Sequence, residues 1–195
     1  GIATFAFLMT FACITPALIS GAVADRMKFS AWMIFVPIWT LVVYSPVVYW
    51  IYAADGWVFK LPGYDFAGGT AIHVNAGAAA LALVIVLGKR TGWPQNRFLR
   101  PHSIPFVMLG AGILWFGWFG FNAGSALAAN GLAAQAFVNT FIGGAAGMVA
   151  WMIVEMVKTG KVSTIGMASG IIAGLATITE PQAMWEPCIH SCSEL

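Results

Sequence analysis

Residues 104–124 read IPFVMLGAGILWFGWFGFNAG and contain no charged side chain. An α-helix rises 1.5 Å per residue, so roughly 20 apolar residues cross the hydrocarbon core of a bilayer, which is about 30 Å thick. Four similar runs occur at 1–22, 30–52, 68–88 and 132–157. A sixth run at 164–179 is too short to span easily. The sequence therefore predicts five membrane-spanning segments and one shorter apolar segment.

The composition supports lipid as the solvent of this chain. Of the 195 residues, 60% are hydrophobic and 8% are charged, against roughly 25% charged in an average soluble domain. Hydrocarbon offers no hydrogen-bond partner to an open backbone, and the runs lack the alternating polarity of barrel strands. The predicted fold class is therefore all-α, a polytopic membrane helical bundle. The net charge of +2 is spread without a basic run, which does not favour nucleic acid as a partner.

The positive charges predict an orientation. Eight of the nine Lys and Arg residues fall in alternate connections, namely Arg26, Lys28, Lys89, Arg90, Arg97, Arg100, Lys158 and Lys161. The remaining one, Lys60, lies in the connection between the second and third segments. By the positive-inside rule, loops 25–29, 89–103 and 158–163 are predicted to be cytoplasmic, and loops 53–67 and 125–131 external.

Glycine and proline indicate how the segments pack. Small residues on one helix face let helices approach closely in lipid. Gly117, Gly120 and Gly124 share one face, and Gly166, Gly170 and Gly174 repeat at four-residue spacing. Proline inside a membrane helix interrupts its hydrogen bonding, so the sequence predicts kinks at Pro16, Pro37 and Pro46.

Asp65 and His73 are the ionisable residues at the start of the third segment. On one continuous helix they would lie about 12 Å apart along the axis and near one face, with Gly69 and Gly77 on the same stripe. An ionisable group within the membrane marks a functional site by default. An interhelical hydrogen bond would also account for His73, and a helix cap for the glycine-rich turn would account equally well for Asp65.

The fourth segment ends with Trp118, Phe121 and Ser125 on one face. Tryptophan at this depth ordinarily belongs to the aromatic belt of a membrane protein. Aromatic rings beside a hydroxyl can also attract a small monovalent cation and replace part of its water shell. Phe7 and Phe11, one turn apart in the first segment, would add ring surface, although two such residues usually only pack.

Three motifs together resemble one known family. They are MTFACITPAL at 9–18, DFAGGTAIHVNAGAAA at 65–80 with GKR at 88–90, and WFGFNAGSA at 118–126. In this order they resemble the signature of the ammonium transporter (Amt/MEP/Rh) family, closest to its Amt branch. The likeness extends over residues 1–179, which we expect to be a partial ammonium transporter membrane domain.

The resemblance implies ammonium transport by a homotrimer in which each eleven-helix subunit has its own narrow hydrophobic pore. This chain would supply helices three to seven and part of helix eight. Ammonium or ammonia, the lipid bilayer and a cytoplasmic nitrogen-signalling regulatory protein are the implied partners. Neither a cofactor nor a metal is implied.

Four residues are implied as the substrate-binding set at the outer mouth of the pore. Ser125, Tyr52 and Trp118 would bind NH4⁺ by hydrogen bonding and cation–π contact, and Asp65 would support the site. Tyr52 stands where the family commonly has tryptophan, a change that keeps a ring but weakens the cation–π attraction.

Three residues are implied for the pore. Phe11 and Phe121 would be the stacked phenylalanines that close it, and His73 would be the first of two pore histidines. A dry pore penalises charge, a cost that ammonium can avoid by losing a proton and potassium cannot. His73 would then hydrogen-bond the dehydrated solute. Its partner histidine belongs to a later helix of the family that this sequence does not include.

Other functions remain open at this stage. An ammonium sensor or regulatory membrane subunit with little flux would use the same outer site, and an inactive transporter fragment would retain the same motifs. An enzyme is not expected, because the metalloprotease motif HExxH and the hydrolase motif GxSxG do not occur. The spacing of Cys188, His190 and Cys192 differs from that of zinc sites.

The ends of the chain suggest a piece of something longer. The first residue is not Met, and an apolar run starts at once without a charged leader. Residues 180–195 have neither membrane character nor family likeness, so we expect a frameshifted or truncated tail there.

Overall fold

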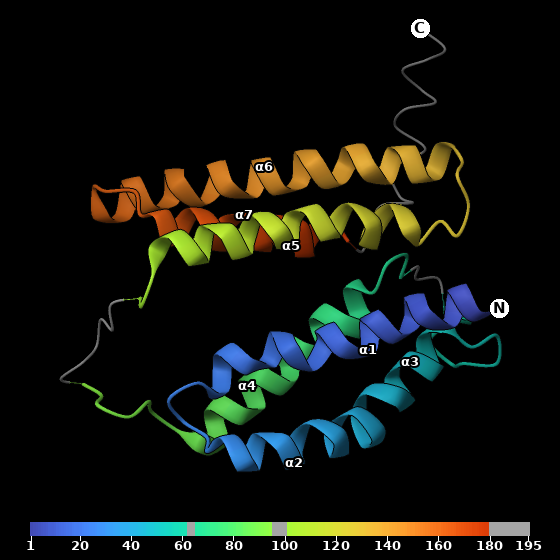
Figure 1. Ribbon diagram of the computed structural model, residues 1–195, viewed down its shortest axis with the longest axis horizontal. Coiled ribbons are helices and arrows are strands. Elements are labelled where there is room, and N and C mark those ends of the chain that lie inside the picture. The colour runs from blue at the N-terminus through green and yellow to red at the C-terminus, as the bar shows by residue number, and fades with distance from the viewer. Residues whose placement is uncertain (62–64, 95–100, 180–195) are drawn as a thin grey trace, which may run out of the picture. The chain divides into compact units, whose positions relative to one another are not determined.

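The computed structural model describes residues 1–61, 65–94 and 101–179, and throughout them every regular element is a helix (Figure 1). The elements are α1 (Ile2–Val23), α2 (Phe29–Trp39), η1 (Thr40–Tyr44), α3 (Ser45–Tyr52), η2 (Gly69–Val74), α4 (Asn75–Leu87), α5 (Ile104–Gly124), α6 (Gly131–Thr159) and α7 (Thr164–Ile178). In these ranges five helical stretches are long and apolar enough to cross a membrane, and α7 is shorter. The predicted all-helical fold is confirmed. The helical stretches begin and end within a few residues of the predicted positions.

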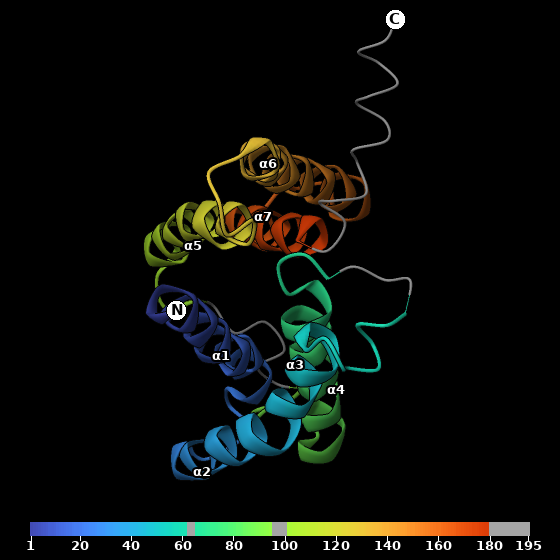
Figure 2. The same ribbon diagram turned by 90° about the vertical axis from the view of Figure 1, so that its right-hand side faces the viewer.

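The chain divides into two compact units, Gly1–Arg100 and Pro101–Leu195, which are described separately as unit 1 and unit 2. In unit 1, α1 packs along α4 and also contacts the π-helical turns η1 and η2. In unit 2, α5, α6 and α7 all contact one another, with α7 against both of the longer helices (Figures 1 and 2). Each unit therefore contains three helical stretches, and in unit 1 the second stretch contacts the other two through η1 and α3.

The second spanning stretch contains a π-helical turn, η1, between Pro37 and Pro46. The backbone N–H of Ser45 donates to the carbonyl of Thr40, five residues earlier, and the Ser45 hydroxyl donates to the same oxygen at 2.9 Å. Pro46 follows directly and has no N–H with which to continue the α-helical pattern. Proline and π-turns are both recognised causes of helix kinks. The predicted interruption thus takes the form of a wider turn, whereas α1 continues as α-helix through Pro16.

The α6–α7 contact depends on glycine. A Cβ atom at Gly147 would lie 2.4 Å from the carbonyl oxygen of Gly170, and one at Gly174 would lie 2.2 Å from that of Gly143. These separations are far below van der Waals contact, so a side chain at either position would push the backbones apart. The predicted close approach is confirmed at Gly170 and Gly174.

The glycines of α5 behave differently. A Cβ atom at Gly117 or Gly120 would meet nothing within 4 Å in the described part of the chain. Within the described residues of unit 2, the helix–helix contact predicted for this face is therefore not made at Gly117 or Gly120. A buried hydrophobic cluster of unit 2 is instead formed by Trp118, Ile171 and Leu175.

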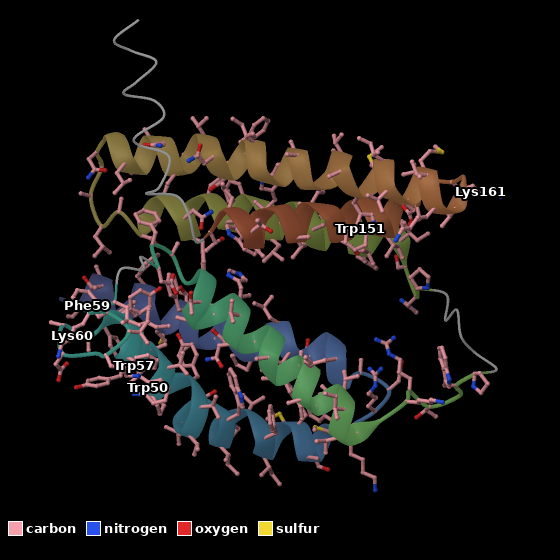
Figure 3. All side chains as sticks on the ribbon, turned by 180° about the vertical axis from the view of Figure 1, so that it is seen from behind. Trp50, Trp57, Phe59, Lys60, Trp151 and Lys161 are labelled. Atoms are coloured by element: carbon pink, nitrogen blue, oxygen red, sulfur yellow. The ribbon has the colours of Figure 1, made fainter. Side chains whose placement is uncertain are left out.

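An aromatic cluster surrounds the end of α3. The rings of Trp50 and Trp57 lie 6.0 Å apart between centroids, and Phe59 and Lys60 follow on the same loop (Figure 3). The Phe59 N–H donates to the Trp50 carbonyl at 3.0 Å, and Gly56 allows the chain to fold back, because a Cβ there would lie 2.3 Å from that carbonyl oxygen. Exposed tryptophan at a helix end is typical of a membrane–water interface.

Candidate functional site

Asp65 organises the turn that begins the third spanning stretch. Its carboxylate accepts hydrogen bonds from the backbone N–H groups of Gly68 at 2.6 Å, Thr70 at 3.0 Å and Ala71 at 2.8 Å. The Tyr52 hydroxyl donates to the same carboxylate at 3.3 Å. A helix N-terminus presents N–H groups that lack intrahelical partners, and a carboxylate is a favourable acceptor for them. Asp65 thus acts as a helix cap, one of the two roles that the sequence leaves open.

The turn also needs glycine. Gly68 has φ +99°, in the left-handed region, and its carbonyl accepts from the N–H groups of Ile72 at 2.9 Å and His73 at 3.2 Å. The second of these bonds spans five residues, which makes Gly69–Val74 a π-helical turn. A Cβ at Gly68 would lie 2.4 Å from the Ile72 Cδ1 atom. Only glycine fits here without strain.

The expectation that Asp65 and His73 share one continuous helix is wrong. Asp65 lies before the helix, which begins at Gly69, so the predicted stripe cannot start at Asp65. His73 is four residues from the start of the helix, or about 6 Å along an axis that rises roughly 1.5 Å per residue. The cause is the cap itself, because a side chain that receives the first N–H groups must sit outside the turn that donates them.

His73 lies half-buried in η2, next to the fully buried Ala71 and Ile72. Both α1 and α3 contact this turn. The imidazole is therefore held in the packed part of unit 1, beside the cap that Asp65 forms.

Phe11 is the buried aromatic residue of α1, with 3% of its surface exposed. Its ring lies 4.9 Å from that of Phe7 between centroids, with the two planes tilted by 58°. The Thr15 hydroxyl donates to the Phe11 carbonyl at 2.6 Å. The two rings, which were expected only to add aromatic surface, therefore contact each other within unit 1.

Trp118, Phe121 and Ser125 lie at the end of α5, as their spacing predicts. The rings of Trp118 and Phe121 are 5.7 Å apart between centroids and tilted by 55°. The Ser125 hydroxyl donates to the Phe121 carbonyl at 2.8 Å. The three residues are therefore neighbours at this end of unit 2, joined by a ring contact and by a bond from the Ser125 hydroxyl to the backbone.

Trp118 also makes a contact that sequence reasoning missed. Its indole N–H donates to the Thr179 hydroxyl at 2.9 Å, and that hydroxyl donates in turn to the Leu175 carbonyl at 2.7 Å. Trp118 is 5% exposed and Thr179 fully buried. The only signal in the sequence is a hydroxyl at the end of an apolar run, which is too common to identify a partner.

A second buried polar pair joins α5 to α6. The Asn122 side-chain amide donates to the Thr140 hydroxyl at 2.9 Å, and this hydroxyl donates to the Ala136 carbonyl at 2.6 Å. Asn122 and Thr140 are both fully buried. Interhelical hydrogen bonds of this kind replace part of the hydrophobic drive that is missing in lipid.

The candidate residues form two groups. Unit 1 contains Phe11, Tyr52, Asp65 and His73, and unit 2 contains Trp118, Phe121 and Ser125. In the first group, Tyr52 contacts Asp65. In the second group, Phe121 contacts both Trp118 and Ser125. No cluster of three or more potential metal-binding side chains occurs among residues 1–61, 65–94 and 101–179. The motif of Cys188, His190 and Cys192 lies outside those ranges.

Comparison with known proteins gives the family. A model described as the Ammonium Transporter Family matches residues 1–191. This range continues past Thr179 into the tail, which lies outside the described residues, and the domain boundary at 179 stays a prediction. An ammonium transporter of Mycobacterium tuberculosis is 59% identical over 182 residues, which cover 89% of this chain and 38% of that protein.

Solved structures of Mep2 and Amt proteins are also similar to this chain. The crystal structure of Candida albicans Mep2 matches with a TM-score of 0.80 and 41% identity, covering 88% of this chain and 39% of that one. A structure titled "Sensor Amt Protein" matches with a TM-score of 0.82 and 28% identity, covering 90% and 46%. The chain spans about two fifths of the length of the curated relatives it matches. With a family match over nearly all of its residues, this chain belongs to the ammonium transporter family.

Proposed function

We propose that the intact protein containing this chain moves ammonium across a membrane. The observation that carries the proposal is the family match over residues 1–191, in a chain with five helices long enough to span a bilayer within its described residues. The family consists of transporters, which supports a membrane carrier over an enzyme. Because the chain covers about two fifths of its relatives, the activity belongs to the longer protein.

At the outer mouth, Tyr52, Ser125 and Trp118 recruit NH4⁺, and Asp65 supports them. The hydrogen bond from Tyr52 to Asp65 supports this role, because it fixes the phenol ring beside the capped turn. The bond of Trp118 to Thr179 similarly restricts its indole to one orientation. Rings held in fixed orientations can offer their faces to a cation without further loss of side-chain entropy.

Inside the pore, Phe11 and Phe121 form the gate and His73 lines the path. The burial of Phe11 in unit 1 and the packing of Phe121 against Trp118 in unit 2 support an apolar gate, because both rings are held by their neighbours. Charge is costly in such surroundings, so the solute passes after it loses a proton. His73 then hydrogen-bonds the uncharged solute, which potassium cannot mimic.

The remaining features follow from the same proposal. The intact protein is a homotrimer in the cell membrane, with loops 25–29, 89–103 and 158–163 cytoplasmic and loops 53–67 and 125–131 external. A cytoplasmic nitrogen-signalling protein is a candidate regulatory partner.

The second candidate function is ammonium sensing with little flux. The observation in its favour is the structural similarity to the protein titled "Sensor Amt Protein". Both functions would use the same binding residues at the outer mouth. Flux is therefore the quantity that separates them.

The test is methylammonium uptake by cells that lack their own ammonium carriers and express the intact protein. A transporter gives uptake well above background, and uptake at background would favour the sensor. His73→Ala should lower uptake or admit potassium. Val74→Ala is the matched control, because Val74 is the next residue of η2 and is 58% exposed. Undiminished uptake with unchanged rejection of potassium in His73→Ala would refute the role of His73.

A further inference from the structure

Two polar turns at one end of unit 1 are fastened to each other. The Arg26 Nε group donates to the Gly88 carbonyl at 2.8 Å, and the Arg90 Nη2 group donates to the Gly21 carbonyl at 3.3 Å. Arg26, which follows α1, thus bonds the end of α4. Arg90, which follows α4, bonds the last turn of α1. Cations near helix C-termini are favourable because the last carbonyls lack intrahelical partners.

Thr91 strengthens the same connection. Its N–H and its hydroxyl both donate to the Asp25 carbonyl at 3.0 Å. Asp25 has φ +59°, an uncommon conformation for a residue other than glycine, and these bonds hold it there. The two turns, 21–30 and 85–94, therefore act as one preorganised surface.

That surface is strongly cationic. The two turns contain Arg26, Lys28, Lys89 and Arg90 and a single acid, Asp25. Lys28, Lys89 and Arg90 are exposed, and Arg26 is half-buried. Arg26 uses Nε and Nη1 for the Gly88 and Ala22 carbonyls, and its guanidinium carries five N–H donors in all. Donors therefore remain to bind an anion.

The position of the charges selects the kind of anion. The spanning helix α1 ends at Val23 and α4 ends at Leu87, so each of the four cations lies two to five residues beyond the end of a helix that can cross a membrane. Because these helices match the hydrocarbon core of a bilayer in length, residues just beyond their ends lie at the level of the lipid phosphates. Guanidinium groups recognise phosphate in fixed geometry, and basic residues beside a membrane span attract anionic lipids.

We propose that Arg26, Lys28, Lys89 and Arg90 form a binding site for the phosphate headgroup of an anionic phospholipid. The interlocked turns present the four cations together, so little ordering is needed when the lipid binds. The aromatic cluster at the end of α3 has a single cation, Lys60, and is not expected to prefer anionic phospholipids. The site is independent of ammonium transport and would be present in a sensor as well.

The experiment measures lipid retention by native mass spectrometry on the intact protein, purified in detergent and freed of lipid. Phosphatidylglycerol and phosphatidylcholine of equal chain length are the probes. The wild type should bind phosphatidylglycerol at least about tenfold more tightly. The double variant Lys28→Gln/Lys89→Gln should lose roughly 25-fold of that affinity, at about fivefold for each cation near the surface. Neither lysine takes part in the fastening bonds described above, so the turns should keep their fold.

The matched control is Lys158→Gln/Lys161→Gln, which removes the same charge from the turn between α6 and α7. It should retain the preference for phosphatidylglycerol. Equal binding of the two lipids, or equal losses in the two double variants, would overturn the proposal. Displacement of phosphatidylglycerol by inorganic phosphate at constant ionic strength would also overturn it, because the cluster would then be a site for a free anion.

Discussion

Units 1 and 2 each contain three apolar helical stretches, yet their helices are joined in different ways. In unit 2, α6 and α7 touch along their backbones at Gly147, Gly170 and Gly174. In unit 1, hydrogen bonds at helix ends also link the elements, from Tyr52 to Asp65 on one side and from Arg26 to the Gly88 carbonyl on the other. Lipid tails are as apolar as leucine, so neither unit gains a hydrophobic drive between helices in the membrane.

The difference shows two solutions to the same problem. Close backbone approach gains dispersion contacts over the full length of a helix pair, but it tolerates no side chain at the crossing points. End contacts rely on charged groups and free backbone N–H or C=O groups, which helix termini always provide. Unit 2 should therefore be sensitive to added volume in its centre, and unit 1 to the loss of polar atoms at its ends.

The largest effect is expected for Gly174→Leu in the intact protein. The new Cβ would lie 2.2 Å from the backbone oxygen of Gly143, so α6 and α7 must separate, at a cost of about 3 kcal/mol. Thermal unfolding in detergent micelles measures this loss. Gly131→Leu is the control, because a Cβ there meets nothing within 4 Å in the described residues. Equal midpoints for the two variants would mean that glycine contact does not hold unit 2 together.

A smaller effect is expected for Asp65→Ala. The change removes the acceptor for three backbone N–H groups and should destabilise the turn by about 2 kcal/mol. Amide hydrogen exchange at residues 68–71 should accelerate roughly 30-fold, since about 1.4 kcal/mol corresponds to a factor of ten. Asp55→Ala, in the same connection but bonded to the Tyr49 hydroxyl, should leave that exchange unchanged. Unaltered exchange in Asp65→Ala would show that the cap does not stabilise unit 1.

The smallest effect is expected for Thr179→Val, which keeps the shape of the side chain but removes the acceptor for the Trp118 indole. The loss should be about 1 kcal/mol, as for other interhelical hydrogen bonds in membranes. The readouts are the unfolding midpoint and the exchange rate of the indole proton. Thr177→Val is the control, because its hydroxyl bonds the Ala173 carbonyl of its own helix. Thr179→Ser should behave like the wild type, and a loss in Thr179→Ser as large as in Thr179→Val would assign the effect to packing.

Much of the fold could be predicted because membrane helices are specified locally. A run such as 104–124 must satisfy all of its backbone groups within itself in lipid, so its length and lack of charge are enough to place a helix. The regularly spaced glycines at 170 and 174 likewise indicate a close contact. They do not identify the partner, since a stripe of small residues fits any helix that presents a matching surface.

The candidate site was less predictable. The adjacency of Trp118, Phe121 and Ser125 follows from helical spacing, and the structure has it. Sequence reasoning left two roles open for Asp65 and wrongly assumed a continuous helix from there to His73. The π-helical turn arises because the Gly68 carbonyl accepts from the N–H groups of both Ile72 and His73. No residue pattern in the segment predicts this turn.

The sequence alone determined that this chain is a set of apolar helices with cationic connections, and that its motifs resemble those of ammonium transporters. These properties depend on composition, length and the order of residues along each helix. Only the tertiary structure decided that Asp65 caps η2, that Trp118 bonds Thr179 and that Arg26 and Arg90 fasten two turns together. The physical reason is that each of these bonds joins a side chain to a partner whose position is set by how the chain folds back, which no single helix encodes.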